Sequence, residues 1–417
     1  LYPTHLWREF RENDLIKLLS LRGLLLPINN DLTEYAPYTP ELVPQVLNVL
    51  GNYLDRLNGS LYKPLSISVD ELKISIEVKP GINIQGSDCE KSLAVLKAVP
   101  ETSSEFLKRY SILMLCVDKL EDEVEQKLGE LNNELALLSS TLNNTIKDAM
   151  NKLNTARNID EYLPGLSTEV RAKINNLIER IKAYLVRISG LELESIKESL
   201  PTVLETINSE VNDLVNLVTT LRGIEDKIKE YTELTSILGN ASVITGIETT
   251  SMSIDDFAND LLLLIRLGSL NALDNYLNEI TRVTETRRKE LSDVLSNVNA
   301  LIDKYTKITA WLKKRTSNKV VSKLLSEGVP EMPRPSPTFD NSKYIIDAIR
   351  GVNKVIESIS KELNIPRELL TKIASLGPNV GIDEEDIARE FNMDMSMVNK
   401  YLEGMWRAGL IDRKYVT

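Results

Sequence analysis

The sequence predicts a mainly α-helical protein in which long antiparallel helices form a coiled-coil bundle, with a small α+β region at the N-terminus and a small helical module at the C-terminus. Three observations predict this fold class. Apolar residues make up 42% of the 417 residues but aromatic residues only 5%, which favours helices packed through Leu, Ile and Val. Leucine-rich heptads run through the middle of the chain, and alternation with a period of two is confined to residues 65–84.

Residues 1–101 are expected to form the α+β region. Apolar positions at helical spacing predict one helix over Asp14–Leu26 and a second that begins near Pro40 and ends at Gly59. Between 65 and 84 the apolar residues alternate, which predicts two or three strands packed on these helices, and Pro80-Gly81 predicts a turn.

Residues 102–328 are expected to form the helical bundle. Three heptad seams, with apolar residues at alternating steps of three and four, support it. They comprise Val124, Leu128, Leu131, Leu135, Leu138, Leu142 and Ile146; then Leu204, Ile207, Val211, Leu214, Val218 and Leu221; then Leu291, Val294, Val298, Leu301, Tyr305, Ile308 and Leu312. Breaks are expected at 158–165, Gly190, Pro201, 239–250 and Gly268. The seams predict either a bundle within one chain or a coiled coil that pairs two chains as a homodimer.

Residues 329–341 contain four prolines and are expected to be an extended linker at the main domain boundary. A docking motif for a partner that binds polyproline II helices is the alternative interpretation.

Residues 342–417 are expected to form the C-terminal module. A helix over Tyr344–Leu363 precedes one from Pro366 to Leu376, and Gly377-Pro378 ends the latter. Asp383 should cap a helix over Glu384–Phe391, and Asp394 should cap a last helix that ends at Gly409. An extended strand is expected from Arg413 onward.

About 50 residues of this module resemble a winged helix-turn-helix domain. The resemblance is carried by Asp386-Ile387-Ala388 on the second helix, Val398, Leu402 and Met405 on the third, and Gly409-Leu410-Ile411 before the wing. It implies that the third helix is a recognition helix for double-stranded DNA, with Ser396, Met397, Asn399, Lys400 and Glu403 facing outward and Arg413 and Lys414 on the wing.

Two features depart from a good DNA-binding module. Residues 366–417 carry seven basic and nine acidic side chains, and only one wing strand is evident, so another segment must supply its partner. Winged helices also serve as protein-docking or dimerisation modules, and a purely structural role is a third interpretation.

A basic cluster between 304 and 323 has no acidic residue inside it. It contains Lys304, Lys307, Lys313, Lys314, Arg315, Lys319 and Lys323, and Trp311 lies in the same run. Basic and aromatic side chains together can contact phosphates and stack on bases. The alternative is a helix end whose basic residues interact favourably with the helix dipole.

The sequence argues against an enzyme, which is the third hypothesis and would need a carboxylate site near the strands at 65–84. His5 is the single histidine, and no phosphate-binding or dinucleotide-binding glycine motif occurs, so we expect no catalytic residues, cofactor or metal. A catalytic domain upstream of Leu1 is left open. Cys89 and Cys116 are interpreted as reduced thiols of a cytoplasmic protein, and no apolar run is long enough to span a membrane.

The leading functional hypothesis is therefore a DNA-associated structural or regulatory protein. Because the net charge is −11, DNA contact must come from local patches: the module through Ser396, Asn399, Lys400, Arg413 and Lys414, and the cluster through Lys307, Lys313, Lys314, Arg315 and Lys319. The alternative is a protein–protein scaffold or regulatory subunit of a larger ATPase, defence or chromosome-organising assembly.

Overall fold

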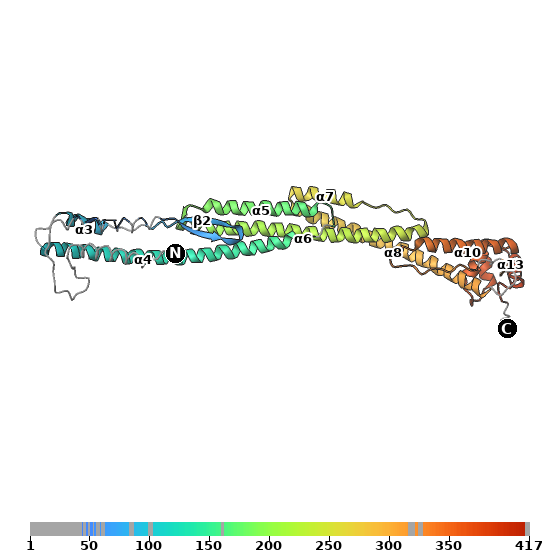
Figure 1. Cartoon of the computed structure of the whole chain (residues 1–417). Coiled ribbons are helices and arrows are strands. Elements are labelled where there is room, and N and C mark those ends of the chain that lie inside the picture. The colour runs from blue at the N-terminus through green and yellow to red at the C-terminus, as the bar shows by residue number, and fades with distance from the viewer. Residues whose placement is uncertain are drawn as a thin grey trace. The chain divides into compact units, whose positions relative to one another are not determined.

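The computed structural model describes residues 63–82, 87–98, 103–159, 162–315, 322–323 and 328–412, with scattered helical positions between 44 and 59. Helices dominate these residues, and one small sheet lies near the N-terminus, so the mainly α fold class is confirmed (Figure 1). Contacts divide the chain into two compact units. The first unit comprises residues 1–159 and 167–218, and the second comprises 160–166 and 219–417. The predicted helix over Asp14–Leu26 lies outside the described residues.

The sheet of the first unit follows the predicted alternation. Strand β1 (Leu65–Val69) pairs antiparallel with β2 (Ile74–Lys79), with Ile67 opposite Ile76, and the 3-10 turn η1 (Asp70–Leu72) connects them. Ile67, Ile76 and Val78 are buried while the residues between them are exposed, as a half-buried strand requires.

A third strand comes from far along the chain. β3 (Leu191–Glu192) pairs parallel with the end of β2. Gly190, at a φ of 84° that favours glycine, donates its N–H to the carbonyl of Glu77 at 2.8 Å. On the opposite side, the Asn143 amide nitrogen donates to the Ser68 carbonyl at 2.9 Å. The sheet is thus tied to the helical bundle.

Three long helices belong to the first unit. These are α4 (Ser103–Arg157), α5 (Leu166–Ile188) and the N-terminal part of α6 (Leu193–Thr245). Lys197 of α6 pairs with Glu134 of α4 at 2.6 Å, and Arg180 of α5 pairs with Glu210 of α6 at 3.2 Å. The seam residues of α4 and α6 are buried or half-buried by the chain's own helices. At about 1.5 Å per residue, α4 is roughly 80 Å long.

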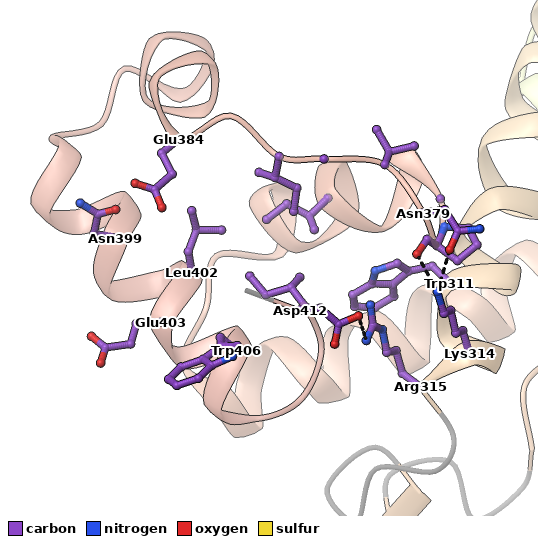
Figure 2. A pocket seen from close by; sticks show the side chains of 17 residues that line it. Trp311, Lys314, Arg315, Asn379, Glu384, Asn399, Leu402, Glu403, Trp406 and Asp412 are labelled. Carbon is purple, nitrogen blue, oxygen red and sulfur yellow. Dashed lines mark hydrogen bonds and ion pairs between the residues drawn. The ribbon is translucent and has the colours of Figure 1, made fainter. Parts of the chain in front are cut away.

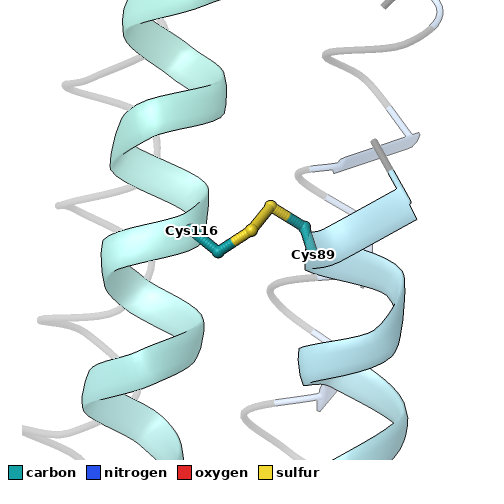
Figure 3. The surroundings of a disulfide bond; sticks show 2 residues. All are labelled: Cys89 and Cys116. Carbon is teal, nitrogen blue, oxygen red and sulfur yellow. A yellow bond between two sulfur atoms is a disulfide. The ribbon is translucent and has the colours of Figure 1, made fainter. Parts of the chain in front are cut away.

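The prediction of reduced thiols was wrong. Cys89 of α3 (Ser87–Lys97) forms a disulfide with Cys116 of α4 (Figure 3). The sequence separation of 27 gave no sign of the bond, because only the antiparallel packing of α3 on α4 brings the two sulfur atoms together.

The second unit begins with the C-terminal part of α6, which packs on α8 (Leu270–Lys314). Thr220 contacts Asp274, and Glu230 pairs with Arg288 further along, so the two helices run in the same direction. The short helix α7 (Ile254–Leu267) returns the chain between them and starts with a capping box formed by Ser253 and Asp256.

Arg287 of α8 holds the loop before α7. Its guanidinium donates to the hydroxyl of Tyr231 at 2.9 Å and to the Thr250 carbonyl at 2.6 Å, and it stacks 5.2 Å from the centre of the Tyr231 ring. Phe257 of α7 meets the same ring edge-on at 5.5 Å. Arg287 therefore connects α6, the loop and α8.

The expected break at Pro201 was also wrong, because α6 continues through it. Proline inside a helix removes one hydrogen bond and costs about 3 kcal/mol. Leu200 and Leu204 on either side are buried. Their burial offsets that cost, and the helix persists.

The proline-rich stretch belongs to the second unit, and residues at both of its ends pack on the apolar cores of that unit. Val329 and Met332 contact the apolar core of this unit, and Pro330 lies so close to Gly351 that a Cβ there would be 2.9 Å from its ring. Phe339 is buried against Leu238 of α6 and Val298 of α8. We expected a linker at a domain boundary, whereas these residues lie within one compact unit.

Four helices complete the second unit close to the predicted bounds. They are α10 (Ser342–Leu363), α11 (Arg367–Leu376), α12 (Glu384–Phe391) and α13 (Met395–Arg407). Asp383 caps α12 by accepting from the Glu385 N–H at 2.8 Å, as predicted. Asp394 precedes α13 as expected, but its side chain makes no capping hydrogen bond.

Candidate functional site

The last turns of α8 and the four C-terminal helices share one apolar core. Ile308, Trp311 and Leu312 of α8 are buried together with Val352, Leu369, Ile373, Val398 and Met405. The Tyr305 hydroxyl donates to the Asn353 side-chain oxygen of α10 at 2.9 Å. The described part of the basic cluster up to Arg315 therefore lies at a helix end that shares its core with the C-terminal module.

Two predicted basic residues of this cluster form ion pairs near the surface. Lys307 pairs with Asp303 one turn earlier at 2.8 Å, and Lys313 pairs with Glu331 of the proline-rich stretch at 2.7 Å. The hydrogen bond from Lys313, together with its positive charge, lowers the pKa of the Glu331 carboxyl. Both lysines thus already have carboxylate partners.

The next two residues hold the module together. Lys314 donates to the Pro378 carbonyl at 3.3 Å and to the Asn379 side-chain oxygen at 2.7 Å, in the segment between α11 and α12. Arg315, which is only 11% exposed, pairs with Asp412 at 3.1 Å. Both cations are therefore engaged by other segments of the same unit.

Helix α13 presents its predicted outward residues to solvent. Ser396, Asn399 and Lys400 are exposed, while Val398, Leu402 and Met405 are buried. The same helix also exposes apolar side chains that the sequence analysis did not single out as a group: Met395 is 40% exposed, and Met397 and Trp406 are each 43% exposed. The outer face of α13 is therefore mixed apolar and polar.

Three predicted contact residues, Lys319, Arg413 and Lys414, lie outside the described residues.

A groove of about 780 Å³ opens beside α13 (Figure 2). We call it the α13 groove. It is lined by residues of α8, α11, the segment between α11 and α12, α12, α13 and the segment after α13: Trp311, Lys314, Arg315, Ile373, Gly377, Pro378, Asn379, Val380, Gly381, Ile382, Glu384, Asn399, Leu402, Glu403, Trp406, Ile411 and Asp412.

The groove brings together three of the predicted site residues, Lys314, Arg315 and Asn399. Lys307, Lys313, Ser396 and Lys400 do not line it. Sequence reasoning missed its walls, Val380–Ile382 and Ile411-Asp412. Val380-Gly381-Ile382 is too short to carry a periodic signal, so the sequence offered none for these walls.

The charges of the groove do not favour an anion. Lys314 and Arg315 already have protein partners, and of the three carboxylates in the lining Asp412 pairs with Arg315 and Glu403 with Arg407. Within the part of the chain that the structure describes, no group of three or more His, Cys, Asp or Glu side chains is placed to hold a metal ion. Among the same residues, no helix combines the length and apolar character that a membrane crossing requires.

Comparison with protein-family models, with curated proteins and with solved structures found no match.

Proposed function

We propose that this protein is a helical scaffold that docks a protein partner through its C-terminal module, and that the module has a winged helix-turn-helix fold. One observation carries the proposal. Lys313, Lys314 and Arg315, the densest part of the expected phosphate-binding cluster, make contacts within the chain, while α13 exposes Met395, Met397 and Trp406 beside a groove. Exposed methionine and tryptophan side chains are enriched where proteins meet proteins.

The shared core supports a scaffold. Because Ile308 and Leu312 pack among the C-terminal helices, the module is fixed to the end of a helix of 45 residues. A docking surface held this way presents its partner at a set distance from the rest of α8. The cytoplasm remains the proposed location. The Cys89–Cys116 disulfide argues against a reducing cytoplasm, because such bonds are typical of oxidising compartments. Intracellular proteins of hyperthermophiles are the exception, since they also contain them.

The test is co-purification of the whole chain from nuclease-treated lysate of its source. We expect one stoichiometric protein partner, retained by Tyr344→Ser and lost by the double variant Met397→Ser, Trp406→Ser. Tyr344 is a matched control because it is 70% exposed on α10 of the same unit. Equal recovery with both variants would remove α13 from the proposal.

DNA binding is the second candidate, and one observation favours it. Lys400 follows Asn399 on α13, and both side chains are exposed. Among the described residues, Lys400 has no ion-pair partner. Anisotropy of a labelled duplex, titrated across salt concentrations, separates the candidates. If DNA is the ligand, Lys400→Ala should weaken binding to all sequences and reduce the salt slope by about one. The scaffold proposal expects no salt-dependent binding even at low salt.

A further inference from the structure

Helix α3 is tied to α4 near both of its ends. In its first turn, Cys89 forms the disulfide with Cys116 (Figure 3). At the other end, the guanidinium of Arg109 on α4 donates to the carbonyl of Val95 at 3.2 Å and to that of Ala98, just after the helix, at 2.5 Å. Carbonyls at a helix C-terminus have no partner within the helix, so Arg109 satisfies two of them. The disulfide thus holds one end of α3 and Arg109 the other.

The helix α3 needs these ties to stay in place. It has 11 residues, and a helix of this length is marginal in water unless other parts of the protein pack on it. Among its described side chains, Cys89 is the buried one, while Lys91, Val95 and Lys97 are exposed. The first turn of α3 therefore depends on the bond to Cys116 to stay on α4.

The two cysteines of the disulfide differ in their access to solvent. Cys89 is only 3% exposed, whereas Cys116 is half-buried. The surface of α4 around Cys116 is open, since Ile112, one turn earlier, is 52% exposed and Leu115 is 70% exposed. A thiolate breaks a disulfide by attacking one of its two sulfur atoms, and access decides which one it attacks. Cys116 is therefore the cysteine that a thiol from solution reaches.

We propose that the Cys89–Cys116 disulfide is a redox-controlled latch: a thiol reductant such as glutathione opens it by attack on Cys116, and the first turn of α3 is then released from α4. The latch belongs to the first unit, whereas α13 belongs to the second. The attachment of α3 would thus follow the redox state of the surroundings, closed when oxidising and open when reducing.

The opening reaction is a thiol–disulfide exchange in two steps. The reductant thiolate forms a bond to Cys116 Sγ while the bond between the two cysteines breaks, and Cys89 leaves with the electron pair as a thiolate and takes up a proton. A second reductant thiolate then attacks the reductant sulfur of this mixed disulfide, so that Cys116 leaves as a thiolate and is protonated. Two electrons pass to the protein, and the two reductant sulfur atoms end joined to each other.

The first test maps the attacked sulfur. The whole chain is incubated with reduced glutathione without denaturant, free thiols are blocked with N-ethylmaleimide after a short time, and the peptides are identified by mass spectrometry. We expect glutathione on Cys116 and N-ethylmaleimide on Cys89, in excess over the reverse arrangement. Glutathione on Cys89 to an equal or greater extent, or no reaction of either cysteine until denaturant is added, would overturn the latch.

The second test separates local release of α3 from unfolding of the whole unit. Reduction with dithiothreitol should speed tryptic cleavage after Lys91 and Lys97 about tenfold, because a protease cuts a helix only when it opens. Cleavage after Arg171, an exposed residue of α5 in the same unit, should stay unchanged. The double variant Cys89→Ser, Cys116→Ser should be cut fast in α3 with or without reductant. Unchanged cleavage of α3 after reduction, or equal acceleration at Arg171, contradicts the proposal.

The variant Arg109→Ala distinguishes the two ties. With the disulfide intact, cleavage after Lys91 should stay as slow as in the unchanged chain, because the first turn of α3 is still bonded to α4. After reduction, the variant should be cut faster than the reduced unchanged chain. Fast cleavage after Lys91 in the oxidised variant would show that Arg109, and not the disulfide, keeps α3 closed.

Discussion

The Arg315 guanidinium lies 3.1 Å from the Asp412 carboxylate, so the end of α8 is held to the segment that follows α13, 97 residues later. Arg315 is only 11% exposed, and its Nε is buried without a hydrogen-bond partner in the described structure. Among the described residues, Asp412 is therefore the carboxylate that neutralises the charge of Arg315.

Asp412→Ala should destabilise the second unit by about 1 kcal/mol, because it leaves a mostly buried cation without its carboxylate, while the exposure of Asp412 screens part of the interaction. Denaturant unfolding followed by the fluorescence of buried Trp311 measures this change. Asp347→Ala is the control, because Asp347 forms an exposed pair with Arg350, and it should change the free energy of unfolding by less than about 0.5 kcal/mol. Equal effects of the two variants would contradict the structural role of Arg315.

Ile308→Ala should lower the free energy of unfolding by about 3 kcal/mol, because it opens a cavity in a fully buried position. If α8 and the module share one core, hydrogen exchange of α11 and α13 should accelerate together with that of α8. Leu263→Ala, at an exposed position of α7, should leave these amides protected. Unchanged protection of α13 in Ile308→Ala would show that the module folds separately from α8.

Reduction of the Cys89–Cys116 disulfide should destabilise the packing of α3 on α4 by about 3 kcal/mol, the cost expected for opening a loop of this length. Hydrogen exchange of α3 with and without reductant measures it. The double variant Cys89→Ala, Cys116→Ala should not respond to reductant. Thiol labelling of both cysteines in the untreated chain would contradict the bond.

Stability should decrease between pH 10 and pH 12 in a way that depends on Tyr276. Burial, and then the nearby Asp260 charge, raise the pKa of Tyr276 from 10.0 to about 12. The unfolded chain releases this proton at lower pH than the folded chain, so the contribution is complete below pH 10 and is lost as the pH rises toward 12. Because the ring is partly exposed, the loss should not exceed about 1 kcal/mol.

Tyr276→Phe should therefore lose less stability over this range than the unchanged chain, as urea unfolding at each pH would measure. Tyr344→Phe, at an exposed ring of α10, is the matched control. Identical pH profiles for the unchanged chain and Tyr276→Phe would refute the assignment.

The helices and the sheet could be predicted because their signals are local. Val398, Leu402 and Met405 recur at helical spacing, and Ile67 and Ile76 alternate with exposed neighbours, and in each case the periodicity alone identifies the buried face. The Cys89–Cys116 bond and the pairing of β3 with β2 depend on residues far apart in sequence, and no local pattern encodes them.

The candidate site was harder to predict for a geometric reason. Lys313, Lys314 and Arg315 look like one basic cluster in the sequence, but successive residues of a helix point about 100° apart. Their side chains therefore reach three different segments, at Glu331, Asn379 and Asp412. The outward positions of α13 were predictable from its apolar face, whereas the groove beside it required the fold.

Helix α6 passes without interruption from one compact unit into the other at residues 218–219. Starting a helix is the costly step of its formation, and each further residue then adds a hydrogen bond. Once either unit has formed its part of α6, the other unit can extend an existing helix and need not nucleate its own. A cut at the boundary would remove that advantage from both, so each half expressed alone should fold more slowly than the same half within the whole chain.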